Sequence, residues 1–208
     1  MKIPTDSYRV PTSSAEFRLT DRASRFFGYV APAADEAAAL VVVAERSRLH
    51  HDASHHCWAF RVGSPANLLE RSSDAGEPSG TAGRPILDAI KGAGLYGCVA
   101  VVTRWFGGTL LGRGGLIRAY GLAASEALKL TPTKEIIPTA RFVVECGYDL
   151  IGLVEQIASK AGGTVTGGDY GADAHISVEI PLATATGFAE RLVDASGGRV
   201  KVGGGKTS

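Results

Sequence analysis

Hydrophobic and polar positions in the first two thirds of the chain predict alternating strands and helices. β-Favouring aromatic residues predict a strand region over residues 18–30, and an Ala- and Val-rich run predicts a helix that begins near Asp35. Alternation predicts a second strand over residues 56–62. Residues 97–106 give the strongest strand signal, because they are apolar on both faces, which is typical of a central strand.

Two glycine-rich segments interrupt this pattern, and each precedes a predicted helix. Residues 64–84 are rich in Ser, Gly, Pro and Asp and predict a loop, after which Pro85 opens a helix that ends near Gly92 and Gly94. Residues 107–115 predict a glycine-dense turn before a helix that reaches Leu128. The first part of the chain therefore mixes a sheet with helices.

Two prolines, Pro132 and Pro138, interrupt the periodicity and predict a linker that ends a first domain at residue 136. We expect residues 137–208 to form a second domain, with its first helix capped by Asp149 and residues 203–208 frayed. The predicted order is strand 140–146, helix 150–161, strand 164–168, strand 175–180, helix 186–195 and strand 199–202. This βαββαβ order predicts a ferredoxin-like sandwich, and the whole chain is expected to be α+β.

The composition is that of a folded protein, with 45% hydrophobic and 21% charged residues. Nowhere does an apolar run approach the roughly 20 residues of a membrane span, and residues 1–10 lack the apolar core of an export signal. We therefore expect a cytoplasmic protein without membrane association. The 3 cysteines lie far apart and predict buried thiols rather than disulfides or a zinc ribbon.

The charge of the chain is unevenly distributed, although its formal net charge is only +1. Residues 1–136 hold 16 Lys and Arg against 13 Asp and Glu, a net charge of +3, and residues 137–208 hold 6 against 8, a net charge of −2. Residues 84–118 contain five cationic residues and one acidic residue, Asp88. This local excess is the feature that favours an anionic partner such as RNA.

Two segments are more particular than generic loop composition. They are residues 71–87, RSSDAGEPSGTAGRPIL, and residues 101–120, VVTRWFGGTLLGRGGLIRAY. Their order and spacing closely resemble the IMPACT/YigZ family, and residues 24–26 and 55–60 match weaker upstream elements. The resemblance is carried by residues 71–128.

The resemblance implies an N-terminal α/β domain similar to a domain of elongation factor G and of a small-subunit ribosomal protein. In bacterial-type members a ferredoxin-like domain similar to the last domain of that factor follows. Eukaryotic members carry an additional N-terminal domain and restrain an initiation-factor kinase by competing for its activator. We expect this chain to lack that domain, so that contact is not carried over. The sequence departs from the family at Ala75, Trp105 and His56, where an acidic residue, tyrosine and asparagine are commoner.

The first glycine-rich segment is a candidate phosphate site. Its backbone N–H groups and the dipole of the following helix could hold a phosphate beside a basic side chain. The candidate residues are Ser79, Gly80, Thr81, Gly83 and Arg84. A tight structural turn, in which glycines only permit unusual backbone angles, explains the same residues equally well.

The second segment adds four candidate residues for nucleic-acid or phosphate binding. Arg113 is the strongest, because a long cation between glycines is a poor packing residue, and Arg118 follows it closely. Arg104 could instead pair inside the protein with Asp74 or Glu77. Trp105 could stack on a base or pack into the core.

No catalytic residue, metal or cofactor is predicted. The histidines at positions 50, 51, 55 and 56 run from a helix end into a strand, where successive side chains point in opposite directions, so we expect solvated or hydrogen-bonded rings. The leading hypothesis is a non-enzymatic binding protein that contacts RNA or the ribosome and regulates translation. The alternatives are a hydrolase or nucleotide-dependent enzyme that uses Asp74, Glu77, His55 and residues 79–83, and a module that binds a protein partner.

Overall fold

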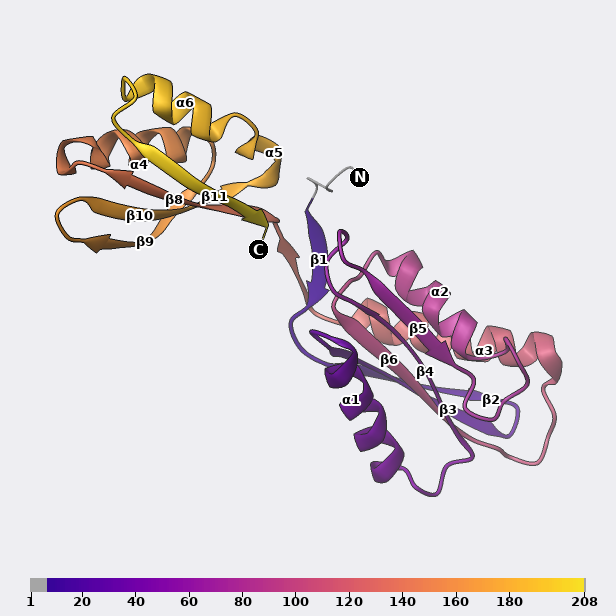
Figure 1. Ribbon diagram of the computed structural model, residues 1–208. Helices are drawn as coiled ribbons and strands as arrows, with labels where there is room; N and C mark the ends of the chain where they lie inside the picture. The colour runs from indigo at the N-terminus through magenta and orange to yellow at the C-terminus, as the bar shows by residue number, and fades with distance from the viewer. Residues whose placement is uncertain (1–6, 208) are drawn as a thin grey trace. The chain divides into compact units, whose positions relative to one another are not determined.

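The computed structural model describes residues 7–207, and the chain divides into two compact units (Figure 1). One unit is Tyr8–Ile136, and the other contains the chain from Ile137 onward. Across residues 7–207, each helix is either too short or too polar to cross a bilayer. Residues 1–6, part of the segment considered for an export signal, and Ser208 lie outside the described residues.

The first unit is built on a five-stranded antiparallel sheet with the strand order β2-β3-β6-β4-β5. The strands are β2 (Ala15–Asp21), β3 (Ser24–Pro32), β4 (His55–Val62), β5 (Leu69–Ser73) and β6 (Cys98–Trp105). β6 is the middle strand and is buried from Cys98 to Arg104, which confirms the central strand predicted from its continuous apolar pattern.

Helices cover both faces of this sheet. α1 (Glu36–Leu49) lies on one face, and α2 (Gly83–Ala93) and α3 (Gly112–Leu130) lie together on the other. Asp35 caps α1 by accepting a hydrogen bond from the amide of Ala38 at 2.8 Å. The left-handed backbone of Gly94 ends α2, as the sequence predicted.

Three segments of the first unit differ from the prediction. The strand region over residues 18–30 is a hairpin of β2 and β3 that turns at Arg22. The predicted loop over residues 64–84 contains β5, whose polar sequence acquires its extended form by pairing with β4. The predicted linker contains β7 (Thr133–Ile136), which pairs antiparallel with β1 (Tyr8–Pro11) in a two-stranded ribbon. In each case hydrogen bonding to a partner strand, which the pattern of the segment itself does not reveal, decided the structure.

The second unit is a four-stranded antiparallel sheet with the order β11-β8-β10-β9. Its elements are β8 (Thr139–Cys146), the 3-10 turn η1 (Tyr148–Leu150), α4 (Ile151–Lys160), β9 (Thr164–Tyr170), β10 (Ala174–Pro181), α5 (Leu182–Ala185), α6 (Phe188–Ala195) and β11 (Lys201–Thr207). Alternate residues of β8 and β10 are buried in a core with residues of α4 and α6. The observed sequence of strands and helices agrees with the predicted one, apart from the short additional elements.

Two local predictions in the second unit are wrong. Asp149 does not cap α4: the helix follows η1 without a side-chain cap, and the Asp149 carboxylate accepts a hydrogen bond from Arg199 at 2.8 Å. The described part of the predicted frayed tail is the strand β11, which pairs with β8 despite its three glycines. Backbone pairing along a sheet edge needs no side-chain pattern, so the composition of the tail did not reveal it.

Candidate functional site

Residues 74–84 of the first glycine-rich segment and the whole second segment lie at the same end of the first sheet. β6 ends there at Trp105, opposite Arg25 at the start of β3, and Arg104 lies opposite His55 at the start of β4. α2 begins next to the end of β5, since a Cβ atom on Gly83 would lie only 2.7 Å from the backbone of Ser73. The fold therefore gathers the segments that the sequence singled out, and we call this the loop end.

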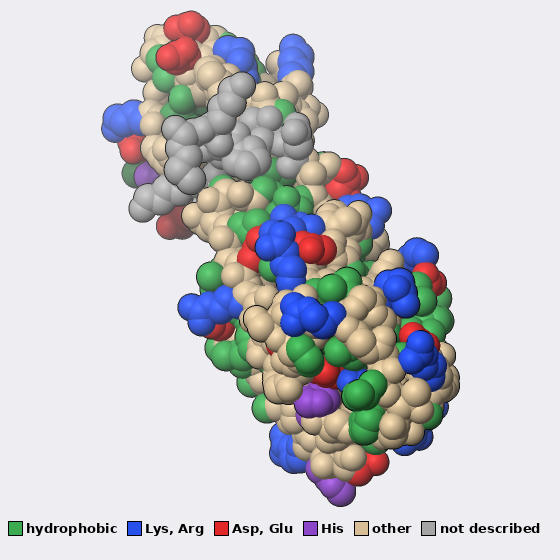
Figure 2. All heavy atoms as spheres, turned by 90° about the vertical axis from the view of Figure 1, so that its right-hand side faces the viewer, with side chains coloured by type: hydrophobic (Ala, Val, Ile, Leu, Met, Phe, Trp, Pro, Cys, Tyr) green, Lys and Arg blue, Asp and Glu red, His purple; other side chains and the backbone are tan. Residues whose placement is uncertain are grey.

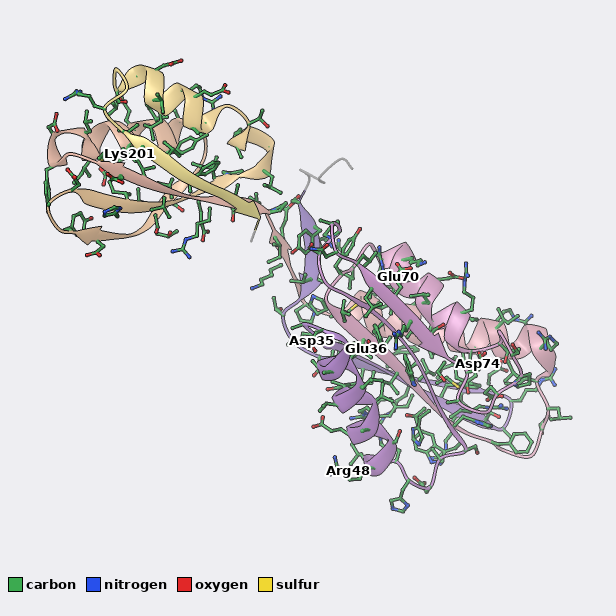
Figure 3. All side chains as sticks on the ribbon, in the orientation of Figure 1. Asp35, Glu36, Arg48, Glu70, Asp74 and Lys201 are labelled. Carbon is green, nitrogen blue, oxygen red and sulfur yellow. The ribbon has the colours of Figure 1, made fainter. Side chains whose placement is uncertain are left out.

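Asp74 occupies the N-terminus of α2 (Figure 3). Its carboxylate accepts hydrogen bonds from the amides of Gly80 at 2.8 Å, Ala82 at 2.9 Å and Gly83 at 2.8 Å. Burial by itself raises the pKa of Asp74, but these three bonds outweigh it, so the pKa lies below its ordinary value and the group is ionised at neutral pH. The N–H groups considered for a phosphate thus already hold an anion of the chain itself.

The candidate residues of this first segment have different environments. Thr81 is fully buried and its hydroxyl donates to the carbonyl of Pro78 at 2.6 Å, and Gly83 is buried as well. Ser79, Gly80 and Arg84 are exposed. For Thr81 and Gly83 the geometry is that of the structural turn, and the exposed three remain accessible to a ligand.

Glu77 lies at the centre of a buried polar network beneath the loop end. It accepts hydrogen bonds from Arg104 at 2.6 Å and Tyr120 at 2.7 Å, and His55 Nε2 lies 3.9 Å from the same oxygen. Arg104 is only 5% exposed and also donates to Ser24 at 3.1 Å. Of the two fates considered for Arg104, the structure shows the internal pair, so its guanidinium does not face a ligand in solvent.

The remaining members of this network are held in their neutral forms. Burial raises the pKa of the Cys57 thiol to about 12, and the thiol donates to the Asp74 carbonyl. Burial likewise raises the pKa of Tyr120, so its hydroxyl stays protonated and donates to Glu77. The network offers no activated nucleophile, and both carboxylates of the hydrolytic alternative are occupied by partners within the protein.

The histidines of this region make separate local contacts. His55 Nδ1 lies 3.0 Å from the Ala75 carbonyl, and His56 Nδ1 lies 3.2 Å from the Thr103 hydroxyl. Within residues 7–207, no three His, Cys, Asp or Glu side chains come together in a metal-binding arrangement.

The second glycine-rich segment is more open. Phe106 is 46% exposed and Leu110 is 78% exposed, and α3 begins at Gly112 without a side-chain cap. Arg113 in its first turn is exposed and donates to the Ser79 carbonyl at 3.0 Å. This hydrogen bond joins the second glycine-rich segment to the first.

Four arginines surround the joined segments. Arg22 donates to the Leu110 carbonyl at 2.7 Å, and Arg84 pairs with Asp88 at 2.9 Å across an exposed turn of α2. The Arg118 side chain is exposed, and within residues 7–207 it forms no ion pair or hydrogen bond. We call residues 79–80 and 106–111 together with Arg22, Arg84, Arg113 and Arg118 the loop surface. Figure 2 shows this side of the unit, where Lys and Arg side chains are spread among exposed hydrophobic ones.

Trp105 lies on the opposite face of the sheet from the Glu77 network and is half-buried. Its indole N–H donates to Asp52 at 2.8 Å, the Arg25 guanidinium lies 5.0 Å from its ring, and His50 contacts it edge-on at 5.2 Å. The Trp105 ring is therefore held in place by its neighbours, and part of it stays exposed to solvent, so it is neither a buried core residue nor a fully free stacking surface.

Sequence patterns did not indicate that Arg18, Arg22, Arg25 and His50 belong to the site. The hidden hairpin is the reason, since only a turn at residue 22 brings Arg22 and Arg25 to the loop end. The resemblance at residues 24–26 includes Arg25, and Arg22 lies three residues before it.

Comparison with known proteins gives the chain its family. Residues 22–128, about half of the chain, match the Impact N-terminal domain. An IMPACT family member of Haemophilus influenzae is 36% identical in an alignment that covers 94% of this chain and 95% of the relative's length. The chain belongs to the IMPACT family. Residues 144–199 of this IMPACT family chain match a domain of unknown function, DUF1949.

Further relatives extend over both units. The IMPACT family member YigZ of Escherichia coli is 33% identical in an alignment that covers 95% of this chain and 97% of the relative's length. A solved structure described as that of a hypothetical protein is 33% identical, covers 94% of this chain and 96% of its own, and superposes with a TM-score of 0.66. These matches therefore extend over both units of the chain.

Proposed function

We propose that this IMPACT family member is a non-enzymatic binding protein that contacts RNA, on its own or within the ribosome, through the loop surface and thereby regulates translation. The observation that carries the proposal is the hydrogen bond from Arg113 to the Ser79 carbonyl, which joins two glycine-rich segments into one cationic surface. The proposal places the protein in the cytoplasm, where translation occurs.

The arginines of the loop surface are available to phosphates. Within residues 7–207, the side chains of Arg22 and Arg113 donate to carbonyl oxygens and form no ion pair, although the Arg113 cation is near enough to Asp74 to help lower the pKa of that carboxyl. Arg84 is paired with Asp88, but both side chains are more than half exposed, and such surface pairs contribute only about 0–1 kcal/mol. A phosphate can therefore displace the carboxylate at little cost.

Rigid support beneath the loop surface also favours binding. The Asp74 carboxylate fixes the amides of three loop residues, and the buried pair of Glu77 and Arg104 ties the same loop to the central strand. A surface fixed before binding loses little conformational entropy when a ligand arrives. The same contacts weaken the enzymatic alternative, because they occupy both Asp74 and Glu77.

The strand order of the second unit supports its assignment as a ferredoxin-like sandwich. All neighbouring strands are antiparallel in the order β11-β8-β10-β9, and helices follow β8 and β10. We infer from the resemblance stated above that the two units correspond to domains of elongation factor G. That correspondence is an analogy of fold, and it supports a role near the ribosome without showing one.

The test is salt-dependent binding of RNA and of purified ribosomes to the full chain. The double variant Arg113→Ala, Arg118→Ala is expected to weaken binding at low salt. It is also expected to lower the dependence of log K on log salt by about 0.7 for each phosphate of a single strand that the variant no longer neutralises.

The matched control is Lys91→Ala, Lys129→Ala. It removes the same charge from the last turns of α2 and α3, away from the loop end, and is expected to have little effect. Binding to neither RNA nor ribosomes at low salt would refute the proposal. Capture of a protein partner that resists nuclease treatment, without RNA binding, would favour the protein-interaction alternative.

A further inference from the structure

A pocket of about 350 Å³ opens on the α1 side of the first sheet, next to the loop end. Its walls include Arg18 of β2, Arg25 and Phe27 of β3, His50 after α1 and Trp105 of β6. Phe27 lies directly opposite Arg18, and Trp105 lies directly opposite Arg25. Cross-strand partners project from the same face of a sheet, so the four side chains share one surface.

Flat groups line this pocket. The Arg18 guanidinium lies 5.0 Å from the centre of the Phe27 ring, and the Arg25 guanidinium lies 5.0 Å from the Trp105 ring. His50 contacts Phe27 and Trp105 edge-on, at 5.4 and 5.2 Å between ring centres. Phe27 is 6% exposed and forms the floor, whereas Trp105 keeps an exposed part.

Positive charge dominates the pocket. Arg18 and Arg25 are exposed, and within residues 7–207 neither takes part in an ion pair. Arg46 adds a third guanidinium behind Phe27 at 5.2 Å from its ring. The acidic neighbours of His50 are Asp52, already bonded to the Trp105 indole, and Glu16.

His50 contributes a flat ring rather than a charge. Burial lowers the pKa of His50, and the neighbouring cation of Arg46 lowers it further, so the ring is neutral at physiological pH. Arg46 Nη2 lies 2.8 Å from the Nε2 atom of His50.

We propose that this pocket seats one unpaired nucleobase of single-stranded RNA, stacked against Trp105 and the Arg25 guanidinium, while Arg18 and Arg25 face the adjoining phosphates. This inference rests on the proposed RNA binding and names its substrate class. Pockets for small ligands span roughly 300–1,000 Å³, so a site of this size suits one flat group rather than an element of a partner protein. Bases stack on aromatic rings and on guanidinium planes alike.

The position of the pocket fits a strand of RNA that continues over the loop surface. Trp105 is followed directly by the exposed segment 106–111, and Arg22, three residues before Arg25, donates to Leu110 within that segment. A base-paired duplex keeps its bases stacked inside the helix and cannot place one in the pocket. The inference therefore separates single-stranded from duplex RNA.

Trp105 fluorescence provides the first test. The chain has 2 tryptophans, and Trp58→Phe leaves Trp105 as the reporter. A single-stranded oligouridylate is expected to quench Trp105, and the same strand annealed to its complement is expected to bind without quenching.

Affinity provides the second test. Trp105→Leu is expected to lower single-strand affinity about 10-fold or more, the effect of one stacked base, and to leave duplex affinity unchanged. Trp105→Phe, which keeps an aromatic face, is expected to retain most of the affinity. Circular dichroism establishes that each variant is folded. An equal loss with Phe and Leu contradicts stacking.

Three outcomes are distinguishable. If Trp105→Leu and Arg18→Ala, Arg25→Ala leave single-strand affinity unchanged while Arg113→Ala, Arg118→Ala weakens it, the pocket proposal falls and the loop surface stands. If inorganic phosphate competes as well as uridine monophosphate, the pocket is an anion site and the nucleobase assignment is wrong. If neither RNA form binds at low salt, the proposed function itself fails.

Discussion

The two glycine-rich segments at the loop end resemble each other in sequence and differ in structure. Each joins a strand to a helix and each has an arginine at the second position of that helix. At α2 the helix N-terminus is closed by Asp74, which takes three amide hydrogen bonds. At α3 the first turn has no side-chain cap, and the preceding residues are exposed.

The difference teaches that glycine content alone does not identify a phosphate site. A glycine-rich helix N-terminus is open to a phosphate only if no side chain of the protein already occupies its N–H groups, and at α2 the Asp74 carboxylate occupies them. The first segment acts as the rigid support and the second as the accessible part of the same surface. Variants that disturb one segment should therefore affect stability, and variants of the other should affect binding.

The largest effect is expected for Arg104→Ala. It leaves the Glu77 carboxylate buried with only Tyr120 and a distant His55 as partners, and breaking a buried pair in this way costs about 3–5 kcal/mol. The free energy of unfolding from urea denaturation measures it. A loss below about 1 kcal/mol would show that the network does not support the first segment.

Asp74→Asn is expected to lower the free energy of unfolding by about 1.5–3 kcal/mol at pH 7, because hydrogen bonds to a charged acceptor are replaced by weaker ones. Asp88→Asn is the matched control on α2: its carboxylate is exposed, so its loss is expected to stay below about 1 kcal/mol. Equal losses in the two variants would contradict the role given to Asp74.

The stability difference between the wild type and Asp74→Asn is also expected to depend on pH. The pKa of Asp74 is lower in the folded protein than its ordinary value of 3.8, so the unfolded state takes up the proton first as pH falls. Its contribution is complete above that ordinary value and is lost as pH falls through the folded pKa. The stability gap between the wild type and Asp74→Asn should therefore be widest at neutral pH and close below pH 3.8.

A smaller effect distinguishes the two segments in RNA binding. Arg113→Ala is expected to lower the salt dependence of log K by about 0.7, the value for one phosphate contact on a single strand. Arg84→Ala should lower this salt dependence less, because the Arg84 guanidinium is already paired with the Asp88 carboxylate. Comparable changes in the two variants would remove the functional distinction between the segments.

The smallest effect concerns Ala75, which has a left-handed backbone with φ of 45°. Ala75→Gly removes the steric cost of that conformation, about 1–2 kcal/mol, and adds back the backbone entropy of glycine, about 0.5–1 kcal/mol. A net gain of about 0.5 kcal/mol in the free energy of unfolding is expected. A loss would mean that the methyl group of Ala75 contributes packing.

Elements with a strong hydrophobic period could be predicted from the sequence. The helix α2 and the alternating order of the second unit follow from apolar spacing that burial enforces, whereas β6 follows from its continuous apolar run and α1 from its Ala- and Val-rich composition. The polar strands β5 and β7 could not, because their extended form comes from hydrogen bonds to partner strands: β4, across the loop of residues 63–68, and β1, far away in the sequence. Local patterns carry no information about such pairing.

The site was predictable in its location and less so in its chemistry. Spacing and charge pointed to Arg113 and to both glycine-rich segments. The capture of Gly80, Ala82 and Gly83 by Asp74 was not predictable, because it depends on the path of the chain between β5 and α2. The pocket around Trp105 depends on cross-strand register, which the hidden hairpin obscured.

The ribbon of β1 and β7 brings together the two ends of the first unit. Tyr8 is paired directly with Ile136, so the unit begins and finishes at one place. Units whose ends meet tolerate circular permutation and insertion into other proteins. We therefore expect that the unit Tyr8–Ile136 can be inserted into a surface loop of another protein while the two ends of that loop stay close together.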